Sequence, residues 1–261
     1  MSVVLACIWF FILGTAMGSF FNVLIDRLPE GRDIVSTRSS CENCGTKLKW
    51  IDLIPVFSFV FLRGKCRYCG AKLSPWYLIS ELIVGALYAF SFLLYSLDAN
   101  ALRPFSHLVI WSLLFIVAVM DQKTGMIMDL FSILIAVFSI GFGLLEKRPI
   151  LEILLGGAVG AAFFGILYLG ARLILKKEGM GLGDVILLGA IGFGLPWVQV
   201  IVTGFLTAYV AILFIVIRAI AGRSVGMKTE IPLGPSICIS AFIMTICGSS
   251  IVGFLSHLLF R

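Results

Sequence analysis

Charged residues are scarce in this sequence. Asp, Glu, Lys and Arg make up 13% of the 261 residues, and hydrophobic residues make up 60%. An ordinary soluble domain has about 25% charged and about 45–50% apolar residues. This composition excludes a disordered chain, a collagen-like fibre and a small disulfide scaffold. It is the composition of a membrane protein, and at about 20 residues per span the chain has room for six to nine membrane helices.

The first apolar run, residues 3–24, lacks a basic flank. No Lys or Arg precedes it, so it does not have the charged start of a signal peptide, and we expect a retained membrane helix. A later run, 185–196, is short for a span and is expected to be tilted or to form a hairpin with the next helix through Gly194 and Pro196. The eight runs that predict membrane helices are 3–24, 77–97, 107–120, 130–145, 151–175, 185–196, 198–216 and 236–259.

Lys and Arg concentrate in alternate loops. If the N-terminus lies outside, the loops that face the cytoplasm hold sixteen of the twenty Lys and Arg, nine of them in 26–75. Because this bias follows the positive-inside rule, the pI near 9.0 reflects topology, and we expect no nucleic-acid partner. The sequence therefore predicts an all-α polytopic membrane protein of about eight helices. Its predicted domains are a first transmembrane helix (1–25), a small cytoplasmic domain (26–75) and a membrane-embedded domain (76–261).

Four of the seven cysteines form two Cys-x-x-Cys pairs in the predicted cytoplasmic domain. Cys41 and Cys44 make one pair, Cys66 and Cys69 make the other, and a glycine follows each pair. Two such pairs suit one tetrahedral zinc ion. Two disulfides or four ordinary thiols are the alternatives, but cytoplasmic thiols stay reduced, which disfavours the disulfides. Because four thiolates would fill the coordination shell, the predicted zinc is structural.

Two aspartates stand at helix ends on the predicted cytoplasmic side. Asp121 follows the third apolar run, and Asp184 closes the sequence Gly181-Leu-Gly183-Asp184. Either one alone could be a helix cap or an interfacial charge, and Lys123 could pair with Asp121. Two carboxylates at one membrane depth could instead act as base and acid on a water and a peptide carbonyl, which is aspartic protease chemistry. We therefore treat both as candidate catalytic residues.

The two glycines before Asp184 could admit an extended substrate backbone and allow a sharp turn. A nucleotide-binding loop is excluded, because no strand precedes Gly181 and Gly183 and no Lys-Ser/Thr follows them. Glu81, about one turn inside the second span, is a further candidate, since acids within membranes are costly. It could support catalysis or pair with a basic side chain at the interface.

Together, the motifs resemble those of bacterial type IV prepilin peptidases over nearly the whole chain. They include Gly18-Ser-Phe-Phe-Asn22, the paired cysteines, Gly181-Leu-Gly183-Asp184 and Pro232-Leu-Gly234-Pro235, in the family's order. Two positions depart from the family pattern. Met128 stands where the family often has Pro, and Ile186 stands where it often has Lys.

The resemblance implies a GxGD aspartic endopeptidase of the bacterial inner membrane. Such an enzyme removes the basic leader of prepilins and pseudopilins after a glycine, at the cytoplasmic face, in type IV pilus and type II secretion pathways. The catalytic pair would be Asp121 and Asp184, with Gly181 and Gly183 as the active-site glycines. The resemblance also implies N-methylation of the new N-terminus with S-adenosylmethionine, an activity that the family ties to its cysteine domain.

Other classes of function remain open from the residues alone. A secondary transporter or proton channel would also place paired acids among glycine-rich helices, although more naturally near the midplane of two related halves. A zinc-knuckle binding module anchored by the helices is a third possibility.

Overall fold

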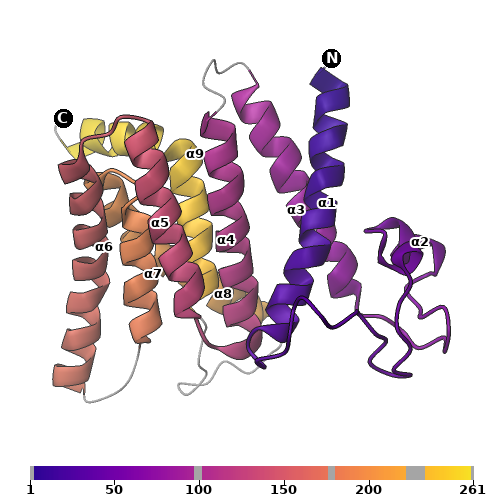
Figure 1. Cartoon of the computed structure of the whole chain (residues 1–261). Coiled ribbons are helices and arrows are strands. Elements are labelled where there is room, and N and C mark those ends of the chain that lie inside the picture. Colours follow the sequence, from indigo (N-terminus) through magenta and orange to yellow (C-terminus); the bar gives the residue numbers. More distant parts are fainter. Residues whose placement is uncertain (1–2, 97–101, 176–179, 222–232, 260–261) are drawn as a thin grey trace. The chain divides into compact units, whose positions relative to one another are not determined.

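The computed structural model describes residues 3–96, 102–175, 180–221 and 233–259. Within those residues every regular element is a helix, and the β-structure is limited to two isolated bridges. The chain divides into two compact units, Met1–Leu108 and Val109–Arg261. Figure 1 labels the helices along the chain. The elements are α1 (Val3–Arg27), the 3₁₀ turn η1 (Trp50–Leu53), α2 (Phe57–Phe61), α3 (Pro75–Tyr95), α4 (Leu102–Thr124), α5 (Asp129–Leu145), α6 (Ile150–Gly170), the π-helical turn η2 (Ala171–Leu175), α7 (Leu182–Gly192), α8 (Trp197–Ile220) and α9 (Gly234–Leu259).

Six of these helices are long and apolar enough to cross a membrane, namely α1, α3, α4, α6, α8 and α9. The chain is therefore a multi-pass membrane protein. The apolar helices α5 and α7 are shorter, with 17 and 11 residues. Each of the eight predicted runs overlaps one of these helices, so the all-α membrane fold is confirmed. The short run 185–196 corresponds to α7 and to the four residues that connect it to α8.

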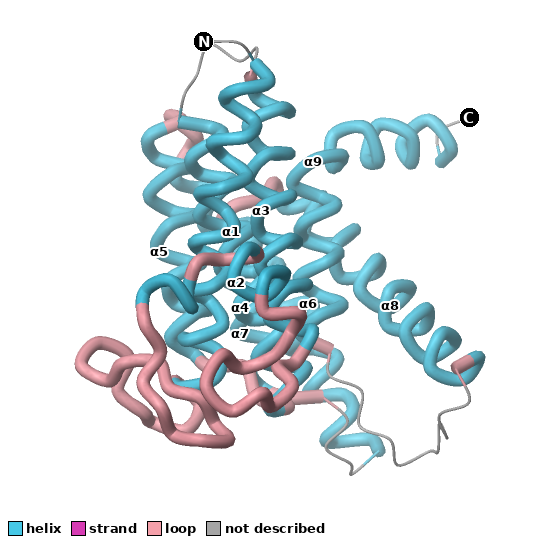
Figure 2. The backbone as a smooth tube through the Cα atoms, turned by 90° about the vertical axis from the view of Figure 1, so that its right-hand side faces the viewer, coloured by secondary structure: helices cyan, strands magenta, loops and turns pink. Residues whose placement is uncertain are grey.

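The first unit is built on the pair α1 and α3. A Cβ on Gly18 would lie only 2.9 Å from Glu81 Cα, so the glycine lets the two backbones approach closely. Near the C-terminal end of α1, the buried Asn22 donates from Nδ2 to Ser80 Oγ at 2.8 Å. Tyr77 donates to Asp26 Oδ2 at 3.1 Å. Residues 28–74, which are loops apart from η1 and α2, are grouped at this end of α1 and α3 (Figure 2).

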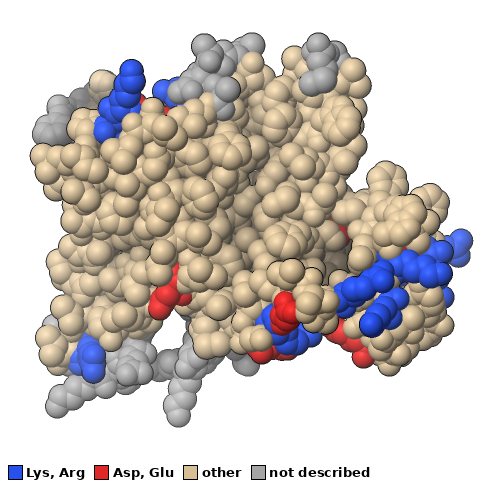
Figure 3. All heavy atoms as spheres, in the orientation of Figure 1, with Lys and Arg blue, Asp and Glu red and all other residues tan. Residues whose placement is uncertain are grey.

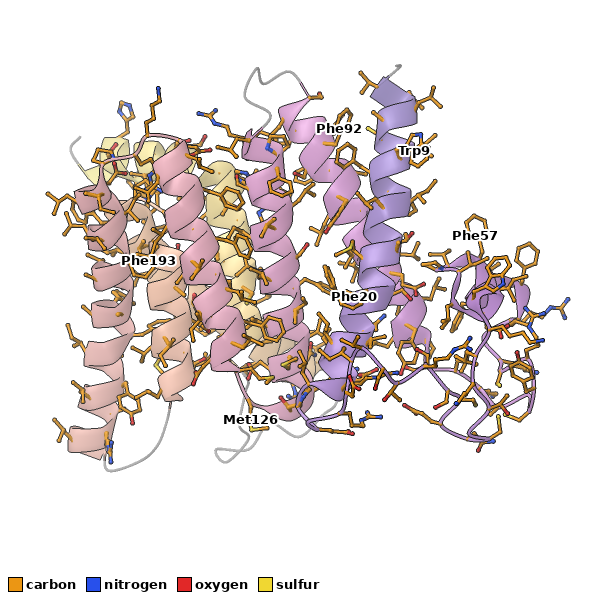
Figure 4. The ribbon with its side chains drawn as sticks, in the orientation of Figure 1. Trp9, Phe20, Phe57, Phe92, Met126 and Phe193 are labelled. Atoms are coloured by element: carbon orange, nitrogen blue, oxygen red, sulfur yellow. The ribbon has the colours of Figure 1, made fainter. Side chains whose placement is uncertain are left out.

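In the second unit, α6 and α7 pack backbone against backbone. A Cβ on Gly160 would lie 2.5 Å from Leu188 O, and one on Gly156 would overlap Gly192 O. Phe193, which follows α7, lies over Gly157 (Figure 4). Lipid tails are as apolar as the side chains of membrane helices, so no hydrophobic force drives such helices together. Close packing at small residues, as at these glycines, stabilises the contact instead. This packing fixes α7, and with it the start of that helix, relative to α6.

We expect Gly160→Ala to destabilise the protein by about 1–3 kcal/mol, because the new methyl meets a backbone carbonyl that cannot move aside easily. Gly165→Ala on the same helix is the matched control, since its Cβ would meet only Val185 Cγ1 at 3.8 Å. Thermal unfolding of the purified variants measures the difference. Equal unfolding temperatures for both variants would contradict this description of the α6–α7 contact.

Candidate active site and metal centre

Asp121 lies in the last turn of α4 and is buried, with 4% of its surface exposed. The helix runs on to Thr124, so hydropathy alone placed its end a turn too early. Oδ2 of Asp121 accepts a hydrogen bond of 2.9 Å from the backbone N–H of Gly234, the first residue of α9. This bond brings together two positions that are 113 residues apart in the sequence.

Asp184 lies in the first turn of α7 and is also buried. Its Oδ2 accepts a hydrogen bond of 3.1 Å from the N–H of Gly181, which precedes the helix. A carboxylate at the third helical position commonly accepts from the residue before the helix and so satisfies one of the unpaired N–H groups there. Asp184 therefore stabilises the start of the helix that carries it.

The two carboxylates interact electrostatically with each other. Both also act on the thiol of Cys238, which is buried in α9. The structure thus assembles one buried acidic site in the second unit from α4, α7 and α9. Paired buried carboxylates of this kind can share a proton and divide acid and base roles.

The two glycines before Asp184 have different surroundings. Gly181 is exposed, and its extended backbone (φ −77°, ψ 148°) is one that any residue can adopt. Gly183 faces the loop after Asp121, where an added Cβ would lie 3.2 Å from Ile127 Cβ. Gly183 therefore lets the start of α7 lie close against that loop. Access of a substrate backbone to these glycines stays a prediction.

Gly234 lies at the candidate site, although no sequence pattern assigned it a role. Its N–H bonds to Asp121, and an added Cβ would lie 2.5 Å from Asp121 Oδ2. The available signal was the sequence Pro232-Leu-Gly234-Pro235, in which a glycine between two prolines favours an irregular backbone that can approach another group. Of this motif, Pro232 lies outside the described residues.

If Asp121 is catalytic, as the family resemblance implies, we expect Gly234→Ala to lower the rate of peptide cleavage by about 100-fold, because the methyl would displace the Asp121 carboxylate and small misplacements of a catalytic group are costly. Gly253→Ala, on the same helix, is the matched control, since an added Cβ there meets nothing within 4 Å. The initial rate of cleavage, measured with folded protein, compares the two. A Gly234→Ala rate equal to that of Gly253→Ala would contradict the tight fit at Asp121.

Glu81 lies in the other unit, in α3, and is buried. Its Oε2 accepts a hydrogen bond of 2.7 Å from the N–H of Val56, and Ser19 also bonds to it. The bond from Val56 links α3 to the chain between the two cysteine pairs, and the bond from Ser19 links α3 to α1. A supporting role in catalysis for Glu81 stays a prediction.

The four paired cysteines lie together, with their sulfur atoms all within 4.8 Å of one another. Tetrahedral zinc with Zn–S bonds of about 2.3 Å places its sulfurs about 3.8 Å apart, and Cys41 and Cys69 Sγ are 3.9 Å apart. All four cysteines are free, so the two-disulfide alternative does not apply in this structure. The donor set and its spacing fit zinc.

Each cysteine pair forms the same turn. The N–H of Gly45 donates to Cys41 O, and the N–H of Gly70 donates to Cys66 O. Both glycines have a positive φ, +68° and +71°, which this turn requires and which glycine adopts without strain. The likeness extends to the sequence as an eight-residue repeat, Cys-x-x-Cys-Gly-x-Lys-Leu, at 41–48 and 66–73. The repeat indicates that the two cysteine turns have the same structure, which the spacing of the cysteines alone does not indicate.

Hydrogen bonds lower the pKa of one of these thiols and so favour the deprotonated form that binds metal. The side chain and backbone of Thr46 bond to Cys44 and lower its pKa to about 6. Cys44 is therefore largely a thiolate at neutral pH, the form that binds zinc. Cys41 and Cys66 are buried, whereas Cys44 and Cys69 are exposed, so the centre lies at the edge of its segment.

Comparison with protein families gives two matches that together cover most of the chain. Residues 12–95 match the bacterial peptidase A24 N-terminal domain, and residues 108–217 match the type IV leader peptidase family. The first match spans α1, the cysteine pairs and α3. The second contains both Asp121 and Asp184.

Among curated proteins, the chain is similar to several named prepilin leader peptidase/N-methyltransferase. It is 36% identical to that of Klebsiella pneumoniae over 72% of this chain and 84% of the relative. It is 31% identical to that of Bacillus subtilis (94% and 95% covered) and 33% identical to that of Vibrio cholerae (91% and 95% covered). No solved structure matches the chain.

Proposed function

Because the chain belongs to the type IV leader peptidase family, we propose that it is a membrane aspartic endopeptidase that removes the basic leader of type IV prepilins and pseudopilins after a glycine. The observation that carries the proposal is the buried pair Asp121 and Asp184. The two carboxylates come from separate helices and interact with each other. Family membership gives no support to the transporter or proton channel alternative.

In the proposed mechanism, one carboxylate takes a proton from water as the water attacks the scissile carbonyl. The other, protonated, hydrogen bonds to the carbonyl oxygen and stabilises the charge that develops there. Proton return to the leaving amine then breaks the peptide bond. The N–H groups of Gly234 and Gly181 orient the carboxylates through Oδ2 of Asp121 and Asp184, and in the proposed mechanism the Oδ1 atoms act on water and substrate.

The test is to incubate purified protein with a prepilin and to follow the mass of the substrate. Cleavage after the leader glycine gives a mass loss equal to the leader peptide. An intact prepilin after prolonged incubation with folded, zinc-loaded protein would sink the proposal.

The second proposed activity is N-methylation of the new N-terminus, with S-adenosylmethionine as the methyl donor. Its support is the name shared by the relatives. The described residues contain no parallel sheet, so a methyl donor bound among them would not use a Rossmann-type cleft. When bound, the donor supplies an activated methyl group to the free amine.

We assign the four cysteines to one structural zinc ion. The ligands would be Cys41, Cys44, Cys66 and Cys69, and the metal would supply folding free energy to its segment. Since thiolates fill the shell, no position is left to polarise a peptide carbonyl. Cleavage then depends on the aspartates alone.

We place the enzyme in the bacterial inner membrane with the aspartates and the cysteines facing the cytoplasm. The support is the distribution of Lys and Arg among the loops, which follows the positive-inside rule. In spheroplasts, a membrane-impermeant maleimide is expected to label Lys147→Cys but not Lys123→Cys. Lys123→Cys should react only after the cells are opened. Equal labelling of both positions in intact spheroplasts would contradict this topology.

A further inference from the structure

The segment between the two cysteine pairs exposes an apolar surface. Trp50, Phe57, Val60 and Phe61, which we call the apolar patch, have exposed fractions of 76%, 61%, 60% and 81%. They belong to η1 and α2, which lie within twelve consecutive residues. Single exposed apolar residues are ordinary, but a cluster of large ones marks a surface that contacts something other than water.

Hydrogen bonds connect the segment that carries the apolar patch to the second cysteine turn and to α3. On one side, the Asp52 carboxylate accepts hydrogen bonds from Arg67 Nε at 2.6 Å and from Tyr68 OH at 2.9 Å, both in the second cysteine turn. On the other side, Glu81 of α3 accepts the N–H of Val56. Burial by itself raises the pKa of Asp52, but the hydrogen bonds outweigh it and the net pKa is lowered, so this carboxylate is charged at neutral pH.

The bond to Glu81 sets the depth of the segment. Glu81 is six residues beyond Pro75, the first residue of α3, which at 1.5 Å per residue is about 9 Å along the helix. Since α3 is a membrane span, the Val56 backbone lies beside that span and not beyond its end. Phe57 accordingly lies level with the part of α1 between Trp9 and Phe20 (Figure 4).

The backbone at this tip is suited to an environment without water. The chain reverses at Val56, which has a φ of +64°, and Glu81 accepts its N–H. The N–H of Ser58 donates to Ile54 O and that of Val60 donates to Val56 O, both at 3.0 Å. In a bilayer such groups must be satisfied within the protein, and at these positions they are.

Basic residues flank the apolar patch. Lys49 precedes it, and Arg63 and Lys65 follow it, all three exposed. Figure 3 shows Lys and Arg gathered on the cysteine-bearing segment beside an uncharged tip. Long basic side chains beside apolar ones suit a membrane surface, where they reach lipid phosphates while the apolar groups enter the acyl region.

We propose that the apolar patch inserts into the lipid of the membrane that α1 and α3 cross, with Lys49, Arg63 and Lys65 at the anionic headgroups. The segment then holds the zinc-binding turns against the bilayer. Depth, apolar exposure and the charged flank together favour lipid over a protein partner. This inference does not depend on the proposed peptidase activity.

Photo-cross-linking of the full-length protein tests the insertion. Phe61→p-benzoylphenylalanine keeps an aromatic ring at the tip, and the protein is reconstituted in vesicles of phosphatidylethanolamine and phosphatidylglycerol. Val35→p-benzoylphenylalanine is the control, because Val35 is apolar and 94% exposed but lies outside the apolar patch. Zinc content and thermal unfolding confirm that both variants are folded.

The expected result is a lipid adduct, found by mass spectrometry, with at least about tenfold higher yield at position 61 than at 35. No lipid adduct at 61, equal yields at both positions, or an adduct only to a second copy of the chain would overturn the proposal. An adduct only to a prepilin, when one is added, would assign the surface to substrate instead.

Quenching by lipids brominated in the acyl chain gives an independent measurement. Trp50→Tyr is expected to remove a quenched component from the fluorescence of the protein. Adding Val35→Trp to that variant is expected to restore fluorescence without restoring the quenching. Unchanged quenching in Trp50→Tyr would show that Trp50 does not reach the acyl chains.

Discussion

Replacing either Asp121 or Asp184 with asparagine is expected to lower the rate of prepilin cleavage by about 10⁴-fold or more. Peptide hydrolysis needs a base for the water and an acid for the leaving amine, and a pair that shares one proton supplies both only when each carboxylate is present. Groups that act as one unit are strongly non-additive. The double variant is therefore expected to be no slower than either single one. The measurement is the initial rate of leader release by mass spectrometry.

Glu152→Gln is the matched control for this experiment. Glu152 is an acid of the same unit, but it lies in the first turn of α6, accepts a hydrogen bond from Arg148 and is not part of the aspartate pair. Its replacement is expected to leave cleavage within about twofold of wild type, as for most surface substitutions. Substantial cleavage by a folded Asp121→Asn or Asp184→Asn protein would exclude the two-aspartate mechanism.

Replacing Cys41 and Cys44 together with serine is expected to remove essentially all bound zinc and to unfold the segment between the two cysteine turns. Zinc contributes about 10–16 kcal/mol of apparent binding free energy to small zinc-binding peptides, and that free energy becomes folding free energy. Two remaining thiolates cannot complete a tetrahedral shell. Elemental analysis and limited proteolysis at residues 41–69 measure the two effects.

Cys247→Ser is the control for that experiment, because Cys247 is an exposed cysteine in α9, outside the cluster. It should keep one zinc per chain and an intact cysteine segment. Cleavage of prepilin is expected to survive loss of the metal, since the aspartates lie in the other unit. Wild-type protein purified without chelators that contains no zinc would contradict the metal assignment.

The helices could be predicted because apolar runs report them directly. The predicted helix ends were less accurate than the helices themselves. The hydropathy falls at Asp121 and Lys123, but both residues continue α4. A helix end depends on caps and neighbours, which a hydropathy average does not contain. The short helix α2 was not predicted, because the residue before its five residues, Val56, is held by a tertiary bond to Glu81 that no local pattern shows.

The candidate site was predictable in its residue types but not in its construction. Carboxylates in apolar segments can be recognised as functional candidates, because burying them in a membrane is energetically costly. Paired cysteines can be recognised as metal ligands by their spacing. The bond from Gly234 to Asp121 joins residues more than a hundred positions apart, and no local pattern specifies it. The same is true of the contact between Gly183 and Ile127.

The hydrogen bond between Asp184 and the N–H of Gly181 has a practical consequence for capturing the enzyme with its substrate. The side-chain oxygen of an asparagine can still accept that N–H, so Asp184→Asn should keep the start of α7 while removing the charge. Asp184→Ala would lose both. The asparagine variant is therefore suited to serve as a substrate trap, a folded but inactive protein that holds an uncleaved prepilin long enough for the complex to be isolated and imaged.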